Sequence, residues 1–317
     1  MNNFKPFTLL FGLIFISALT CGQKKKNLAE QLGYPRDAKL LIVHADDIGL
    51  SHSVNSATIA AFEKKGINSG SIMVPCPWFP EIAEYAKEHQ DLDLGIHLTL
   101  TAEWKNYKWD GVLPSIEIPS LINEDGYFYA TTEEVARNAD PKEVEKEIRA
   151  QIERAKAFGI KPTHLDTHMG SLVATPDLFQ LYLKVGKEYN LPVFLPLNYL
   201  QAAAPEILEM TGQDHIFVDN FFMLFDGAPA EQWNESYKEI IENLKPGLNE
   251  VIVHVGINDD EMQAITIDHP DYGAAWRQRD FDYVISKEFR NLLEKNDIYL
   301  VTWKEIQKSL KSSSGNN

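Results

Sequence analysis

Cysteine is scarce in this chain of 317 residues, which contains only Cys21 and Cys76. Positive charge is also in deficit, with 30 Lys and Arg against 46 Asp and Glu. Nucleic acid is therefore not an expected partner, because its phosphates require a basic protein face. Internal repeats are lacking too, so a repeat architecture is excluded. What remains is a chain with 44% hydrophobic residues, enough for a large ordinary core.

The N-terminus has the layout of a secretory signal, expected over residues 1–20. Lys5 precedes a short apolar run, 7–19, that is too short to cross a membrane comfortably. Cys21 follows in the order Ala18-Leu19-Thr20-Cys21-Gly22, which resembles a bacterial lipoprotein cleavage site, although Thr20 departs from the usual small residue. We expect an exported protein anchored in the cell envelope by a lipid on Cys21, with periplasmic or secreted release as the alternative. A lipidated Cys21 would leave no partner for an internal disulfide.

The remainder is expected to divide into a solvated tether over 21–38, one folded domain over 39–311 and a polar tail over 312–317. Short apolar or β-branched runs predict strands at 39–44, 70–74, 92–100, 162–165, 192–195, 216–219, 250–255 and 298–301. Amphipathic runs between them predict helices at 54–65, 79–89, 141–158, 176–189, 230–244 and 281–295. Strands alternating with helices predict an α/β fold with a parallel sheet, here an irregular, TIM-barrel-like (β/α) barrel.

Two long connections, 101–132 and 256–280, leave the C-terminal ends of predicted strands, where barrels usually bind substrates. Their aromatic side chains, Trp104, Tyr107, Trp109 and Trp276, are candidates for stacking on a ring of the substrate. Ordinary loop packing is the alternative for these rings. Arg277 and Arg279 are candidates for binding a charged group of the substrate, with a surface salt bridge as the alternative.

Residues capable of metal and proton chemistry follow several predicted strands directly. The first strand runs into Asp46 and Asp47, and two adjacent carboxylates repel each other unless a cation or a proton is shared. A metal ion would resolve this conflict, with one carboxylate as a ligand and the other free to accept a proton. In a parallel barrel these strand ends converge on one mouth, so residues distant in sequence are expected to become neighbours.

Histidines occupy the other strand ends. His97 lies toward the C-terminal end of a second strand, and His164, Asp166 and His168 alternate at the end of a third. Not all of them need be ligands, because a carboxylate or second imidazole often orients a ligating ring. Two imidazoles and a carboxylate suit zinc or another first-row ion, iron(II) included. His254, after a later strand, is a candidate general acid if it reaches the site.

Four segments together resemble a known family. They are Val43-His44-Ala45-Asp46-Asp47-Ile48-Gly49-Leu50-Ser51, Gly95-Ile96-His97-Leu98-Thr99, Pro162-Thr163-His164-Leu165-Asp166-Thr167-His168 and His254-Val255-Gly256. In this order they resemble the signature segments of the YdjC-like carbohydrate deacetylases, over roughly residues 39–306. His44 stands where members commonly have Asn, and Val255 stands where proline is usual.

The resemblance implies a distorted (β/α) barrel that removes the acetyl group from an N-acetylated amino sugar or oligosaccharide, using one divalent metal ion, zinc or magnesium. It further implies that Asp47, His97 and His168 hold the metal ion. By the same resemblance Asp46 is the base and His254 the acid, and His164 and Asp166 support the ligands.

Two other functions remain as alternatives. One is a barrel hydrolase of the amidohydrolase or phosphoesterase kind, which often carries a His-x-His pair after the first strand. Here that position reads His44-Ala45-Asp46, which supplies half of the pair. The other is a non-catalytic glycan-binding lipoprotein, which would be expected to have lost metal ligands, whereas all three are present.

Overall fold

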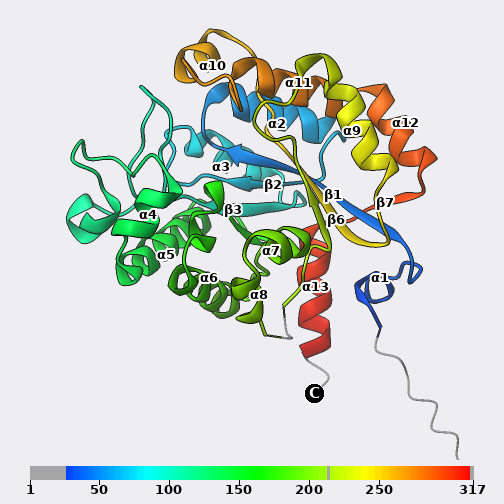
Figure 1. The fold of residues 1–317 in the computed structure, drawn as a ribbon, viewed down its shortest axis with the longest axis horizontal. Coiled ribbons are helices and arrows are strands. Elements are labelled where there is room, and N and C mark those ends of the chain that lie inside the picture. The colour runs from blue at the N-terminus through cyan, green and yellow to red at the C-terminus, as the bar shows by residue number, and fades with distance from the viewer. Residues whose placement is uncertain (1–25, 213–214, 315–317) are drawn as a thin grey trace, which may run out of the picture.

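A computed structural model of the protein describes residues 26–212 and 215–314 (Figure 1). The expected signal segment and Cys21 lie outside the described residues. The expected tether is shorter than predicted, because residues 27–38 are folded and bury Ala29 and Ala38. At the other end, the last helix continues to Ser314, into the expected polar tail. Among the described residues no helix has the length and apolar character needed to cross a membrane.

A curled, entirely parallel sheet forms the centre of the molecule. The order of its strands is β4-β3-β2-β1-β6-β5. One edge of β1 pairs with two strands, with β7 along its first residues and with β2 along its last residues. The strands are β1 (Lys39–Ile48), β2 (Ser69–Ile72), β3 (Leu94–Leu98), β4 (Leu165–Thr167), β5 (Asn220–Phe222), β6 (Gly247–Val253) and β7 (Ile298–Leu300). The predicted parallel α/β fold is thus confirmed, with most strands within a few residues of their expected positions.

Between β4 and β5 the sheet is irregular. Residues 192–195, predicted as a strand, make one isolated parallel bridge, Val193 with Leu165, and the next residue makes another, Pro196 with Val218. Pro192 and Pro196 lack backbone N–H donors, which explains why no continuous ladder forms. The domain is therefore a barrel-like curled sheet with this weakly paired stretch in its wall.

Helices cover the outside of the sheet. They are α1 (Leu28–Gln31), α2 (His52–Glu63), α3 (Phe79–Glu88), α4 (Thr132–Asn138), α5 (Pro141–Ala157), α6 (Pro176–Tyr189), α7 (Leu197–Ala203), α8 (Pro205–Glu209), α9 (Trp233–Glu242), α10 (Asp260–Ile265), α11 (Ala274–Val284), α12 (Lys287–Lys295) and α13 (Trp303–Ser314). The prediction of one helix over 281–295 is wrong, because Ser286 is extended and caps the start of α12 through the backbone N–H of Phe289. The expected loop 256–280 likewise contains α10 and the start of α11.

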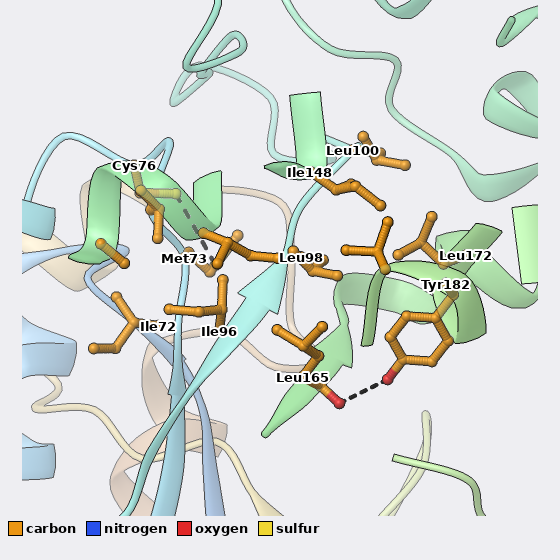
Figure 2. Close-up of a cluster of buried hydrophobic side chains, with 14 of the residues drawn as sticks. Ile72, Met73, Cys76, Ile96, Leu98, Leu100, Ile148, Leu165, Leu172 and Tyr182 are labelled. Atoms are coloured by element: carbon orange, nitrogen blue, oxygen red, sulfur yellow. Dashed lines mark hydrogen bonds between the residues drawn. The ribbon is translucent and has the colours of Figure 1, made fainter. Parts of the chain in front are cut away.

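Side-chain alternation along the strands separates two layers. Leu41, Val43 and Ala45 of β1 face outward and pack with residues of α2, α9, α11 and α12. At the part of the sheet formed by β3, Ile96 and Leu98 also face outward, where they pack into a second apolar cluster (Figure 2). The opposite faces of these strands consequently line the inside of the barrel.

Inside the barrel, an apolar floor gives way to a polar upper part. Leu40, Ile42 and Leu248 form the floor together with Trp303 and Ile306 of α13, and Figure 1 shows α13 at the lower end of the sheet. One step further along β1 and β6, the inward positions are His44 and Glu250, both fully buried. Because buried polar groups require partners, this change marks where the sheet begins to build a site.

Candidate metal centre

Three ligand-type side chains meet at the C-terminal ends of β1, β3 and β4. His97 Nε2 lies 3.2 Å from His168 Nδ1 and 3.5 Å from Asp47 Oδ1. The third side of the triangle, from His168 Nδ1 to Asp47 Oδ1, is 3.3 Å. Ligands at the usual zinc distances of about 2.1 Å lie roughly 3.4 Å apart in a tetrahedron. The triangle therefore has the dimensions of one tetrahedral face, with positions left for water or substrate.

Backbone geometry explains how two successive aspartates reach the same region. Neighbouring residues on a regular strand point to opposite faces. Asp47 instead has a φ of 62°, and the pairing of β1 with β2 shifts register between Ala45 and Ile48. This left-handed turn is an unusual conformation for a residue other than glycine, and such strain is concentrated at functional sites. It places the Asp47 carboxylate beside His97, on the side of the strand that Asp46 also occupies.

Asp47 has two carboxylate oxygens with different surroundings. Oδ2 accepts a hydrogen bond from Arg277 Nη2 at 2.6 Å, whereas buried Oδ1 has no hydrogen-bond partner among the described residues. Burial raises the pKa of Asp47, but Arg277, His168 and His97 outweigh it and hold the pKa well below its usual range. An ionised, buried oxygen without a donor is costly. This oxygen therefore fits a bound cation.

His97 is oriented by a second carboxylate. Its Nδ1 donates to Asp166 Oδ1 at 2.8 Å, which turns Nε2 toward Asp47 and His168. A carboxylate behind a ligating imidazole fixes its tautomer and ring orientation. The structure thus places Asp166 behind His97, not among the three atoms of the triangle.

His168 is oriented in the same way by Glu103, which sequence reasoning missed. The distance from His168 Nε2 to Glu103 Oε2 is 3.1 Å. Burial lowers the pKa of His168, but Glu103 and Asp47 raise it to about 9. Glu103 lies on the long connection after β3, and an isolated acid in a loop gives no signal of such a contact. His168 itself is placed by an abrupt turn, in which Met169 and Gly170 both have positive φ.

Asp46 lies next to the triangle, and His254 lies next to Asp46. Asp46 Oδ2 is 4.0 Å from His97 Nε2 and 4.0 Å from His254 Nε2. Burial lowers the pKa of His254 to about 4, so its ring is neutral near pH 7. The backbone N–H of His254 donates to Asp280 Oδ2 at 2.9 Å, and its ring packs edge-on against Tyr272. The residue expected at the end of β6 thus does reach the site.

His164 lies deeper in the barrel than the triangle, next to α13. Its ring stacks on Trp303 of α13 and packs edge-on against His44. Gly95 leaves the space for this ring, because a Cβ at that position would collide with the imidazole. His164 is not one of the three residues of the triangle, and forms a second group with His44 and Asp166, in which the ligand-type atoms lie within 4.8 Å of one another.

The aromatic candidates for sugar stacking are buried, which corrects the sequence expectation. Trp104, Trp109 and Trp276 are each at most 3% exposed. Trp104 and Trp109 pack against each other and Tyr107, while Trp276 packs against Trp233 and Tyr272. These rings stabilise the walls of the site, because their faces are covered by neighbours.

The two arginines also differ from expectation. Arg277 is buried and binds Asp47, so it is neither a surface ion pair nor free to hold a charged sugar substituent. Arg279 lies over the ring of Trp233, with 4.6 Å between the guanidinium carbon and the ring centre. Both were identified as polar residues of a long connection, whereas helix α11 directs them into packed contacts.

Comparison with known proteins agrees with this geometry. The family model described as "YdjC-like protein" matches residues 40–295. A carbohydrate deacetylase of Thermus thermophilus is 33% identical over 290 residues, covering 90% of this chain and 99% of the relative. A carbohydrate deacetylase of Brevibacillus brevis is 29% identical, covering 84% of this chain and 99% of the relative.

Among solved structures, a proposed cellobiose-phosphate cleavage protein from Enterococcus faecalis V583 has the same fold, with a TM-score of 0.71. It is 24% identical, and the match covers 85% of this chain and 99% of that one. The family match extends over most of the folded region and includes every strand except β7. This chain therefore belongs to the YdjC-like family.

Proposed function

We propose that the protein is a metal-dependent hydrolase that removes the acetyl group from an N-acetylated amino sugar or oligosaccharide. The observation that carries this proposal is the triangle of Asp47 Oδ1, His97 Nε2 and His168 Nδ1. A carboxylate outside the triangle, Asp46, comes within 4.0 Å of His97 Nε2. Two relatives that match this chain almost end to end are named carbohydrate deacetylases, which supplies the substrate class.

The donor set favours zinc or another first-row ion over magnesium. Two imidazole nitrogens and one carboxylate oxygen are typical of zinc sites, whereas magnesium prefers oxygen ligands in an octahedron. A divalent ion bound there would polarise the acetamide carbonyl and make water more acidic. The second nitrogen of each imidazole is held by Asp166 or Glu103, so both rings are oriented in advance.

Asp46 is the proposed base. In the reaction water adds to the acetamide carbonyl and the C–N bond breaks, which yields acetate and a free amino sugar. Asp46 accepts the proton from the attacking water, since its Oδ2 faces the triangle without being one of its three atoms. The departing nitrogen then needs a proton of its own.

His254 is the proposed donor of that proton. Because its resting ring is neutral at pH 7, His254 must first gain the proton that it delivers. Asp46 Oδ2 is 4.0 Å away, so a movement of roughly 1 Å brings the pair within hydrogen-bond reach. One proton can thus pass from water to Asp46, then to His254 and finally to the leaving amine.

Release of acetate from purified protein tests the function. The mature chain, loaded with zinc, is incubated with N-acetylglucosamine oligomers of increasing length and with O-acetylated and phosphorylated sugars. We expect acetate from the N-acetylated substrates, its loss with a chelator and its return with added zinc. Activity confined to the phosphorylated sugars, or unaffected by complete metal removal, would contradict the proposal.

Export is a separate proposal that rests on the sequence of residues 1–21. The Cys21→Ala variant removes the thiol that would carry the lipid. We expect it to move the protein from the membrane fraction to the soluble envelope or medium. An unchanged distribution between these fractions would contradict lipidation.

A further inference from the structure

A fully buried imidazole, His44, lies directly beneath the proposed base. Its Nε2 is 3.1 Å from Asp46 Oδ1 and also 3.1 Å from Asp166 Oδ2. Asp46 is the proposed base, and Asp166 holds the ligand His97. One nitrogen atom thus lies between Asp46 and Asp166, two carboxylates that adjoin the proposed metal ligands but are not ligands themselves.

The neighbours of Nε2 determine which atom carries the proton. Both carboxylate oxygens are acceptors, so Nε2 must be protonated to lie between them. The Nδ1 atom faces Ser69 Oγ at 3.0 Å and Glu250 Oε1 at 3.5 Å. These are also groups to which an N–H can donate.

We propose that His44 is a positioning residue which, as an imidazolium, holds Asp46 and Asp166 side by side through its Nε2–H. This inference rests on the proposed function, since it assigns His44 to the support of the base. One side chain would then fix the place of the base relative to Asp166, whose own hydrogen bond holds His97.

The charges around His44 are consistent with this role. Asp46 and Asp166 reach it from β1 and β4, and Glu250 reaches it from β6. The ring of His164 approaches from just before β4, and the hydroxyls of Ser69 and Ser71 approach from β2. Burial lowers the pKa of His44, but hydrogen bonds to Asp166 and Asp46 outweigh it and hold the pKa well above its usual range.

Glu250 and His164 do not compensate the negative charges of Asp46 and Asp166. Burial raises the pKa of Glu250 to about 8, so this acid is mostly protonated at pH 7 and adds little negative charge. Burial likewise holds the pKa of His164 well below its usual range, so its ring adds no positive charge. Arg277, the buried cation nearby, is committed to Asp47. Without His44, Asp46 and Asp166 would repel each other across a buried space.

Two substitutions at this position separate the hydrogen bond from the packing. The amide of His44→Gln reaches roughly as far as Nε2 and still offers an N–H donor, whereas His44→Leu offers none. We expect His44→Leu to lower kcat roughly 10- to 100-fold, the usual cost of removing an outer partner in a site of this kind. KM and zinc content should change far less, and His44→Gln should recover part of kcat.

His164→Gln is the matched control, because His164 is equally buried and lies beside His44 and Asp166, but is grouped neither with Asp46 nor with the triangle of Asp47, His97 and His168. We expect its effect on kcat to be much smaller than that of His44→Leu. Equal effects of both substitutions, or loss of zinc in step with kcat in His44→Leu, would overturn the positioning role.

A measurement independent of turnover tests the same inference. In zinc-loaded protein labelled with ¹⁵N at histidine, the resonances lost in His44→Gln identify the His44 ring. We expect both of its nitrogens to be protonated at pH 7.5. A neutral ring would overturn the inference even if the protein is an active deacetylase, whereas an imidazolium in a protein without deacetylase activity would leave only the proposed function in error.

Discussion

Arg277 Nη2 lies 2.6 Å from Asp47 Oδ2, although the two residues are 230 positions apart in the chain. Both side chains are almost completely buried. The contact occupies one oxygen of Asp47 and leaves the other facing His97 and His168. The ion pair thereby decides which oxygen is available to a metal ion.

Removing Arg277 should destabilise the metal-free protein more than the zinc-bound protein. The Arg277→Met variant leaves the Asp47 carboxylate buried without its cation, a change that costs about 3–5 kcal/mol. Zinc would restore part of this loss by supplying positive charge at Oδ1. Urea unfolding with excess chelator and with excess zinc measures both values.

Arg279→Met is the control for this experiment, because Arg279 lies on the same helix but packs over Trp233. Its loss of stability should not depend on zinc. If Arg277→Met loses the same free energy of unfolding with and without zinc, Asp47 is not a ligand in the way the geometry indicates.

Glu103→Gln should weaken zinc binding while leaving the ligands in place. The amide can still accept from His168 Nε2 but lacks the charge that raises the basicity of the ring. We expect zinc affinity to fall about 10- to 100-fold, as measured by competition with a chromogenic chelator. Glu117→Gln, an exposed acid of the same connection, should leave the affinity at its original value. Unchanged affinity in Glu103→Gln would show that the contact has no role in binding.

Stability of the metal-free protein should fall with acid partly through His254. Its pKa is about 4 in the folded chain and near the usual 6.5 when unfolded, so between these values only the unfolded chain binds the proton. The contribution of His254 to the free energy of unfolding is therefore constant above pH 6.5. It declines by about 3 kcal/mol in total as the pH falls toward 4. Relative to wild type, His254→Gln should therefore lose less free energy of unfolding between pH 7 and pH 4. Parallel pH curves in urea unfolding would argue against a buried, neutral His254.

Much of the fold follows from local sequence signals. The helix predicted over 176–189 has the observed bounds of α6, because Thr175 caps it and Pro176 occupies its first position. The break between α11 and α12 was missed even though Ser286 is a good cap, since apolar periodicity continues across it. Strand 192–195 was overpredicted because its apolar residues fit a buried strand, while Pro192 and the following Pro196 limit pairing.

The site could be predicted where chemistry coincides with a strand end. Asp47 and His97 lie at the C-terminal ends of β1 and β3, and His168 directly follows β4, so topology alone brings them together. Glu103 and Arg277 could not be found in this way, because their roles depend on how a loop and a helix fold back over the barrel. The burial of the tryptophan rings was equally invisible, since the same residue types serve both packing and sugar stacking.

The most direct test of the account compares the two adjacent aspartates. Asp47→Asn should lose both bound zinc and acetate release, because it removes a ligand oxygen. Asp46→Asn should keep its zinc while acetate release falls about 10²- to 10⁴-fold, the usual contribution of a general base. Metal analysis and acetate release, measured on the same zinc-loaded preparations, give both quantities. Loss of zinc from Asp46→Asn together with its retention in Asp47→Asn would contradict the assignment of ligand and base.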